Sequence, residues 1–362
     1  MSIKLRDKFI GCIAGCHIGS SMGAVPEGMT WQSLKEKYGY LDKLLPFAQG
    51  MNMEIFKTRE NTFYYGPAGT TEDGVERQRL MILAVRDKNG RVTANDIRDS
   101  WVKYMNPGSF GKISMQFEEI LYMLAKAGIP GGDIGHYCDY SGLNSFARAC
   151  HPIGLINAGN IKTAIEDTYD TGRLYQMPYS RGLDWACVTT VSIASATLPD
   201  ATLDSMFQAV FDNCAPRVVN EIKTGLEKTA DCKDIIQMRE RFDDIYNSTG
   251  LMFGAAQAQE VVTKGLCIVK MVNANTKEAI LAGVNMGRDT DCVTAIAGGI
   301  AGALTGWASI PTEWIEQVDK ATKENPYTCS QMTIEGFADA VYNAYQARLD
   351  EEAAFVQTMK GA

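Results

Sequence analysis

The chain has 362 residues, of which 46% are hydrophobic and 22% charged, so it can bury a large core and is neither disordered nor fibrous. Its net charge of −8, with no block of Lys or Arg, excludes the basic surface typical of nucleic-acid-binding proteins. The ten cysteines include no CxxC pair, which predicts reduced thiols. The start lacks an apolar signal segment and the longest uncharged apolar run, 293–304, cannot cross a bilayer, so we expect a cytoplasmic protein without membrane contact.

Helical periodicity recurs along the chain and alternating β-type runs are hard to find, which predicts an all-α fold. Thr93 and Asp96 form a predicted capping box before a helix over 97–104, and an amphipathic stretch over 114–127 stops at Gly128 and Pro130. Loops are predicted at 105–112 and 128–144. Further helices are predicted at about 183–197, 202–213, 216–229, 233–246, 255–272, 276–285, 312–323 and 333–358. We find no linker and no repeat, so residues 1–362 are predicted to form one domain.

Two sets of glycines recur at a spacing of four residues and therefore lie along one face of each predicted helix. Each glycine costs roughly 1 kcal/mol of helix propensity relative to alanine, so a close approach of another backbone must offset the loss. Tight helix packing is a sufficient explanation. The functional alternative is that this packing brings helix ends together around a ligand. The two sets are Gly11, Gly15, Gly19 and Gly23, and Gly298, Gly302 and Gly306.

Two acidic turns precede predicted helices, one at 70–73 and one at 289–291. Carboxylate oxygens are the ligands that hard divalent cations prefer. The structural alternative is helix capping by Thr71 or by Asp289, with acids in the first turn where the helix dipole favours negative charge. If the two turns meet in space, they form a metal cage, and a cation would offset the repulsion between their carboxylates.

Four segments, in order along the chain, resemble the ADP-ribosylglycohydrolase family. They are a glycine helix followed by a loop with a glutamate (11–27), a turn with the sequence Gly-Thr-Thr-Glu-Asp-Gly (69–74), a loop that ends in Pro-Ile-Gly (144–154) and the second acidic turn with its Ala/Gly-rich helix (287–303). The resemblance implies the fold of that family, a single orthogonal-bundle-like domain of many helices, and a pair of Mg²⁺ ions, for which Mn²⁺ is an alternative.

The same resemblance implies a set of site residues. The implied metal ligands are Thr71, Glu72, Asp73, Asp289, Asp291 and Cys292. Asn144 and Tyr175 are the implied substrate contacts. The sequence departs from the family at Glu72 and Ser20, where the family usually has Asp, at Cys292, where it has Thr or Ser, and at Gly74. A thiol is a poor Mg²⁺ ligand, so Cys292 is the weakest member of the implied set.

The resemblance implies hydrolysis of an N- or O-glycosidic bond to ADP-ribose, on a modified protein or on a small molecule. The candidate catalytic bases are Glu27 and Asp73, while His17 and His151 lie in apolar runs and are expected in the core. Two rivals stay open. One is a ribosyl-metabolite or nucleoside hydrolase on the same fold, favoured by the altered positions, and the other is a catalytically silent ADP-ribose-binding relative.

Overall fold

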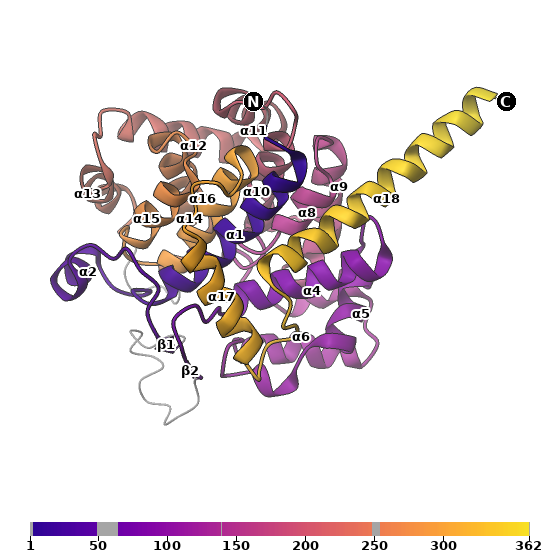
Figure 1. The fold of residues 1–362 in the computed structure, drawn as a ribbon, viewed down its shortest axis with the longest axis horizontal. Coiled ribbons are helices and arrows are strands. Elements are labelled where there is room, and N and C mark those ends of the chain that lie inside the picture. Colours follow the sequence, from indigo (N-terminus) through magenta and orange to yellow (C-terminus); the bar gives the residue numbers. More distant parts are fainter. Residues whose placement is uncertain (1–2, 49–63, 139, 248–253, 362) are drawn as a thin grey trace.

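The computed structural model describes residues 3–48, 64–138, 140–247 and 254–361, and these residues form a predominantly helical fold (Figure 1). The all-α prediction is confirmed. The first half of the chain contributes α1 (Leu5–Ala24), α2 (Trp31–Tyr38), α4 (Asp73–Lys88), α5 (Ala94–Tyr104), α6 (Phe117–Lys126), α7 (Gly131–Ile134), α8 (His151–Ile156) and α9 (Ile161–Thr171). The second half contributes α10 (Arg181–Ala196), α11 (Leu203–Asn213), α12 (Pro216–Thr229), α13 (Ile235–Ile245), α14 (Ala258–Met271), α15 (Thr276–Val284), α16 (Thr290–Thr305), α17 (Thr312–Glu324) and α18 (Ile334–Gly361).

Short elements complete the described part of the chain. The strands found there are β1 (Phe47–Ala48) and β2 (Tyr65–Gly66), which pair antiparallel with Phe47 opposite Gly66. Single 3₁₀ turns occur at η1 (Pro107–Ser109), η2 (Gly135–Tyr137), η3 (Gly172–Leu174) and η4 (Gly254–Ala256). The predicted loops at 105–112 and 128–144 therefore contain short helical turns but no long helix.

Helix boundaries follow the capping signals of the sequence. Thr93 accepts a hydrogen bond from the backbone N–H of Asp96, whose side chain accepts one from the N–H of Thr93, so the predicted capping box of α5 is confirmed. Helix α9 was not predicted. It begins at Asn160, whose side chain accepts from the N–H of Thr163, but its buried positions are largely small or polar residues such as Ala164 and Thr168. Ile161, Ile165 and Tyr169 nevertheless pack against the core at helical spacing, so the sequence carries a short apolar stripe that the prediction missed.

The two glycine sets face each other across the contact between α1 and α16 (Figure 1). A Cβ atom added to Gly15 would lie 2.1 Å from the carbonyl oxygen of Gly298, and one added to Gly302 would lie 2.0 Å from that of Gly11. The backbones touch, so no larger side chain fits between them. The close packing is therefore confirmed, and it also brings the C-terminal end of α1 against the N-terminal end of α16, where a Cβ at Gly23 would lie 2.5 Å from the carbonyl oxygen of Thr290.

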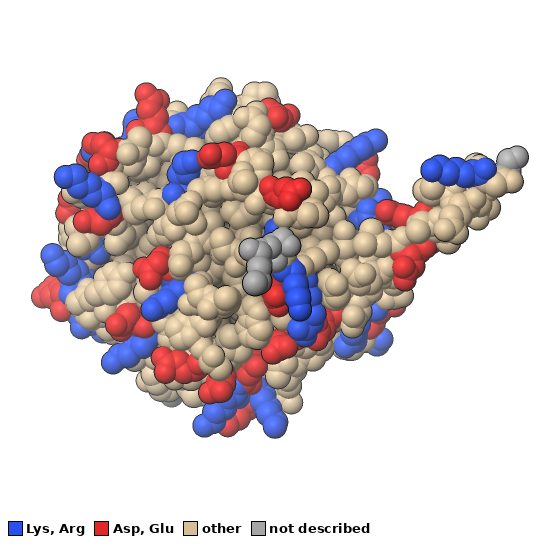
Figure 2. Space-filling model, turned by 45° about the horizontal axis from the view of Figure 1, so that its top comes forward, with Lys and Arg blue, Asp and Glu red and all other residues tan. Residues whose placement is uncertain are grey.

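Helix α16 lies at the centre of the fold, and its residues from Thr290 to Leu304 are all buried. It packs against α1, α10, α14 and α15, and α1 in turn packs against α18 from the other end of the chain. The last part of α18 projects from the body, with exposed residues from 349 onward (Figures 1 and 2). On the face shown in Figure 2, Lys and Arg are interspersed with Asp and Glu.

No helix in the described ranges combines the length and apolar character needed to span a membrane. All ten cysteines lie in these ranges and are free thiols, as the sequence predicts.

Candidate active site

The second acidic turn is held in an unusual backbone conformation at the start of α16. Gly287 and Arg288 have φ values of 82° and 68°, and the second is rare for a side chain of this size. The Arg288 guanidinium pairs with the buried Glu260, with Nε 2.7 Å from Oε1 and Nη2 2.9 Å from Oε2. This bidentate pair stabilises the turn that aims Asp289 into the interior.

The loop that carries Glu27 is attached to the same turn. The N–H of Gly28 donates to the carbonyl oxygen of Arg288 over 2.8 Å, and the N–H of Arg288 donates to that of Met29 over 2.7 Å. Glu27 is therefore carried beside Asp289 by backbone hydrogen bonds between segments far apart in sequence.

Capping does not explain Asp289. It occupies the N-cap position of α16, but its side chain accepts no capping hydrogen bond. Instead, Oδ2 accepts from Nδ2 of Asn144 over 2.9 Å, and Oδ1 is buried without a hydrogen-bond partner. An orphaned buried carboxylate oxygen is unfavourable unless something else binds it.

The first acidic turn is capped by a residue other than the threonine considered from sequence. Glu72 is the N-cap of α4 and its Oε2 accepts from the N–H of Gly74 over 3.1 Å. The buried Oγ1 of Thr71 has no hydrogen-bond partner. Asp73 is the first residue of α4, and its Oδ2 forms an ion pair with Arg77. Thr71 is thus available to a ligand because Glu72 does the capping.

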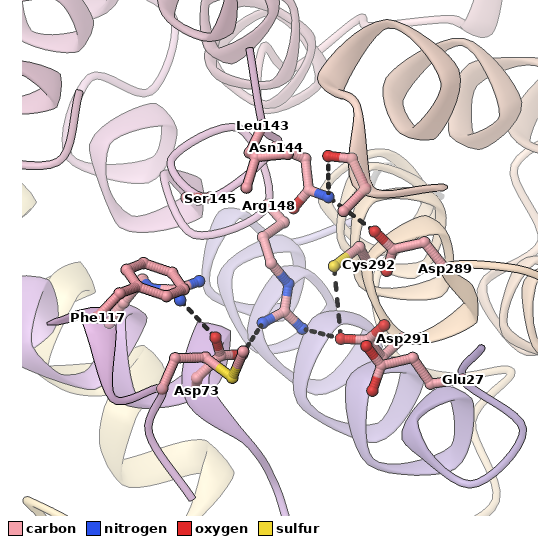
Figure 3. Close-up of a pocket in the computed structure, with 13 residues that line it drawn as sticks. Glu27, Asp73, Phe117, Leu143, Asn144, Ser145, Arg148, Asp289, Asp291 and Cys292 are labelled. Atoms are coloured by element: carbon pink, nitrogen blue, oxygen red, sulfur yellow. Dashed lines mark hydrogen bonds and ion pairs between the residues drawn. The ribbon is translucent and has the colours of Figure 1, made fainter. Parts of the chain in front are cut away.

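Arg148 joins the two turns (Figure 3). Its Nη2 lies 2.6 Å from Oε1 of Glu72 and 3.2 Å from Oδ2 of Asp291, and its Nη1 lies 3.5 Å from Oδ1 of Asp73. A single guanidinium therefore contacts carboxylates of both turns. Sequence reasoning missed this residue, because a buried arginine has the same sequence signature as an exposed one. The available signal was its place in the loop that begins at Asn144, whose carbonyl oxygen accepts from the N–H of Arg148.

Asp73, Arg148, Asp289 and Asp291 line one pocket, together with Glu27 from the turn after α1 (Figure 3). The residues around it are Glu27, Asp73, Arg77, Met115, Phe117, Leu143, Asn144, Ser145, Arg148, Ala256, Asp289, Asp291 and Cys292. Acidic groups lie on both sides of Arg148, with Asp73 beside Phe117 and Asp289, Asp291 and Glu27 opposite (Figure 3). Met115, Phe117 and Leu143 contribute an apolar lining.

Tyr175 does not line this pocket. Its ring stacks on Phe146 with centroids 5.2 Å apart, its hydroxyl accepts from Nε1 of Trp101, and it is 2% exposed. The ring packs against Phe146 and so supports the loop that carries Asn144. The predicted direct contact of Tyr175 with a ligand in the pocket is therefore not present in this conformation.

The two core histidines lie where the sequence predicts them. His17 and His151 are both fully buried. His151 contacts the Ala295 carbonyl oxygen through Nε2 and Gln78 through Nδ1, and burial lowers its pKa to about 3. Neither histidine lines the pocket.

Burial and mutual repulsion perturb the carboxylates of the pocket. Burial, together with the charge of Asp289, raises the pKa of Asp291, and burial also raises the pKa of Asp289. Burial and the charges of these two aspartates raise the pKa of Glu27. Glu72 is the exception: burial acts to raise its pKa, but Arg148 and a hydrogen bond from Ser20 hold it well below its usual range. A bound divalent cation would lower these raised pKa values.

The residues at the start of α16 fit a hard cation. Ligand atoms of Asp289, Asp291 and Cys292 lie within 4.8 Å of one another, and all three residues are buried. Oδ1 of each aspartate lacks a hydrogen-bond partner, so two oxygens of this group are available. Cys292 is the poorest of these donors, because burial raises the pKa of its thiol and Sγ–H donates toward Oδ2 of Asp291 over 3.4 Å.

This arrangement coincides with a family assignment. The sequence model of the ADP-ribosylglycohydrolase family matches residues 1–351. The chain belongs to this family. A solved structure described as an ADP-ribosylglycohydrolase-related protein complex has the same fold, with a TM-score of 0.63 and 15% identity over 94% of this chain and 99% of that chain. No curated protein matches the sequence. The family is one of hydrolases that are typically dependent on two metal ions, so glycosidase chemistry is the family expectation at this pocket.

Replacing the Cys292 thiol tests its place in the site. Cys292→Thr and Cys292→Ser should keep or strengthen Mg²⁺ binding, because a hydroxyl oxygen is a harder donor than a protonated thiol. Calorimetric titration of the metal-free protein with Mg²⁺ measures this. Cys214→Ser, a buried cysteine between α11 and α12, controls for the general cost of a buried hydroxyl. Loss of Mg²⁺ binding in the Cys292 variants alone, or a preference of the native protein for Zn²⁺, would show that the sulfur is a ligand.

Proposed function

We propose that this protein is a divalent-metal-dependent hydrolase that cleaves an N- or O-glycosidic bond of ADP-ribose, attached to a protein or to a small molecule. One observation carries the proposal. Two acidic turns from opposite parts of the chain meet in one pocket, in which Oδ1 of Asp289 and Oδ1 of Asp291 are buried and have no hydrogen-bond partner. Capping alone does not require the turns to meet or the oxygens to be left open.

The cation would be held by Asp289 and Asp291, with Oγ1 of Thr71 proposed as a further oxygen donor and Cys292 at the edge. Mg²⁺ is proposed, with Mn²⁺ as a substitute, because the available donors are carboxylate and hydroxyl oxygens. When bound, such an ion supplies positive charge that orients sugar hydroxyls and acidifies water.

The remaining residues hold and orient the substrate. Asn144 donates one N–H to Asp289 and the other to the carbonyl oxygen of Ala256, so it fixes both the acid and the loop beside it. The apolar lining of Met115, Phe117 and Leu143 offers a face against which a ribose or a base can pack.

Glu27 and Asp73 are the proposed proton acceptors. Asp73 is held in place by ion pairs with Arg77 and Arg148, and burial raises its pKa as it raises that of Glu27. Glu27 is partly exposed at the pocket and has a raised pKa, so it can hold a proton taken from an attacking water. Because two arginines engage Asp73, Glu27 is the better candidate for the base.

A second function is favoured by the contacts of Arg148. A guanidinium that neutralises Glu72, Asp73 and Asp291 leaves fewer negative charges for metal, as expected of a silent ADP-ribose-binding relative. The unpartnered oxygens of Asp289 and Asp291 favour the enzyme. A hydrolase restricted to smaller ribosyl metabolites is the third candidate on the same residues.

A hydrolysis screen separates these functions. Metal-free protein and protein supplied with Mg²⁺ or Mn²⁺ are incubated with ADP-ribosylated peptides, ADP-ribosyl metabolites and nucleosides, and released ribose or ADP-ribose is measured. The enzyme should turn over at least one substrate only when metal is present. Binding of ADP-ribose without metal and without turnover would identify the silent relative and refute the proposal.

Asn144 provides a second test. Asn144→Ala should lower kcat/KM at least about tenfold, because Asp289 loses the donor that orients it, and should cost about 1.5–3 kcal/mol of unfolding free energy for a lost hydrogen bond to a charged group. Asn157 is a matched control, since it is equally buried and its Nδ2 bridges the Ile153 carbonyl oxygen and Asp167. Asn157→Ala should lose similar stability and keep kcat/KM. Equal kcat/KM losses in both variants would contradict the proposed role.

The proposal extends to organisation and location. We propose that residues 1–362 act as one domain, since the pocket combines the turn after α1 with residues of α4 and α16 and with the loop at 143–148. We also propose a cytoplasmic location, which suits ten free thiols.

A further inference from the structure

The guanidinium of Arg148 lies in a cage built for it. It is 1% exposed and contacts four groups: the Ser20 hydroxyl on α1 at 3.0 Å from Nη2, Glu72, Asp73 and Asp291. Glu72 binds it in a bidentate fashion, with Oε1 2.6 Å from Nη2 and Oε2 3.0 Å from Nη1. This planar geometry is specific to arginine.

Space for the guanidinium depends on the glycine at position 74. A Cβ atom on Gly74 would lie 1.2 Å from Nη1 of Arg148 and 2.0 Å from Cζ. Every other residue at this position would displace the guanidinium from between Glu72 and Asp73. Arg148 can therefore occupy this position only because residue 74 is a glycine.

The carboxylates near Arg148 differ in whether their oxygens have hydrogen-bond partners. Both oxygens of Glu72 are occupied: Oε1 accepts from Arg148 and Ser20, and Oε2 accepts from Arg148 and the N–H of Gly74. In contrast, Oδ1 of Asp289 and Oδ1 of Asp291 are buried and have no partner. A cation can approach the aspartates without displacing any donor, but it can reach Glu72 only by removing Arg148.

We propose that the Arg148 guanidinium is a built-in cation that takes one of two cation places, and that this protein binds a single divalent ion, at the Asp289–Asp291 end of the pocket. The inference rests on the proposed function, in which that pocket holds a metal. Ser20, Glu72 and Gly74, three of the positions at which the sequence departs from the pattern of the resemblance, are among the residues that surround the guanidinium.

A guanidinium differs from a divalent ion in ways that matter for the site. Its single charge is permanent and its five N–H donors have fixed directions, so it can neutralise and align Glu72 and Asp73. It carries no open coordination position for water, so acidification of a water would fall to the single ion. The dependence of activity on metal concentration should then follow binding of one ion, without cooperativity.

The number of ions bound decides the question. Metal-free protein is equilibrated with excess Mn²⁺, unbound metal is removed, and manganese per chain is measured together with the electron paramagnetic resonance spectrum. We expect one ion per chain and the spectrum of an isolated ion. Two ions with a spin-coupled spectrum would overturn this inference and leave the proposed function intact, whereas no bound ion would refute both.

Variants at position 148 test whether Arg148 is the reason that the pocket binds one ion. Arg148→Gln removes the charge and should raise the count from one ion to two, because Glu72 and Asp73 become available. Arg148→Lys keeps one positive charge and should keep the count at one. A folded Arg148→Gln protein that still binds one ion with unchanged affinity would overturn the role given to Arg148. If Arg148→Gln does not fold, as judged by circular dichroism, the wild-type count and spectrum decide the inference alone.

Discussion

Asp289→Asn and Asp291→Asn should each lower turnover by at least about a hundredfold while the protein remains folded. Asparagine has nearly the shape of aspartate and keeps one acceptor oxygen, such as the one that Asn144 requires at position 289, whereas only a bound metal needs the negative charge. Removing one of two buried like charges relieves repulsion, so the metal-free variants should be as stable as the wild type or more stable. Turnover on the substrate found in the screen and thermal unfolding without metal are the two measurements.

Asp234→Asn is the matched control. Asp234 is the exposed N-cap of α13, and its side chain accepts from the N–H of Gln237. This variant should keep full activity and lie within about 1 kcal/mol of the wild-type stability. If Asp289→Asn and Asp291→Asn behave like Asp234→Asn, the acidic turn of α16 is structural and the active site is elsewhere.

Gly15→Ala should destabilise the fold by about 3 kcal/mol or more. The added Cβ would lie 2.1 Å from the Gly298 carbonyl oxygen, and a backbone atom of a central helix cannot move aside as a flexible side chain can. Helix propensity alone predicts that alanine raises the free energy of unfolding. A lower free energy of unfolding would therefore show the cost of the close contact. Equilibrium unfolding in urea measures the difference.

Gly90→Ala controls for the change in chain flexibility. Nothing lies within 4 Å of a Cβ at Gly90, in the loop before α5, so this substitution should be neutral or slightly stabilising. The Gly15→Ala variant should also lose metal affinity, because α1 and α16 hold the Glu27 loop and the second acidic turn together. An unfolding free energy equal to that of the wild type would contradict the observed α1–α16 packing.

Local signals in the sequence predict much of the fold. The capping box of Thr93 and Asp96 lies entirely within four residues, so its outcome depends little on the rest of the chain. The glycine spacing predicts close packing, although only the structure shows that Gly15 meets Gly298. Helix α9 escaped prediction although Ile161, Ile165 and Tyr169 pack against the core at helical spacing, because small and polar residues fill its fully buried positions.

The acidic residues of the candidate site can be predicted from the sequence, whereas the arginine that contacts them, Arg148, cannot. The turns at Asp73 and Asp289 each carry a compact signature, and they do line one pocket. The roles within each turn depend on three-dimensional partners: Glu72 caps α4 in place of Thr71, and Arg148 reaches both turns from a loop that was expected only to bind substrate. Tyr175 shows the same limit, because its burial beneath that loop follows from packing on Phe146 and Trp101.

The most direct test of a metal site is diffraction from crystals soaked in Mn²⁺, with data collected for the anomalous signal of manganese. The account predicts an anomalous peak in the pocket with carboxylate oxygens of Asp289 and Asp291 within about 2.0–2.6 Å, the range for hard divalent cations. A pocket without a peak, in crystals where Mn²⁺ is bound elsewhere or not at all, would contradict it.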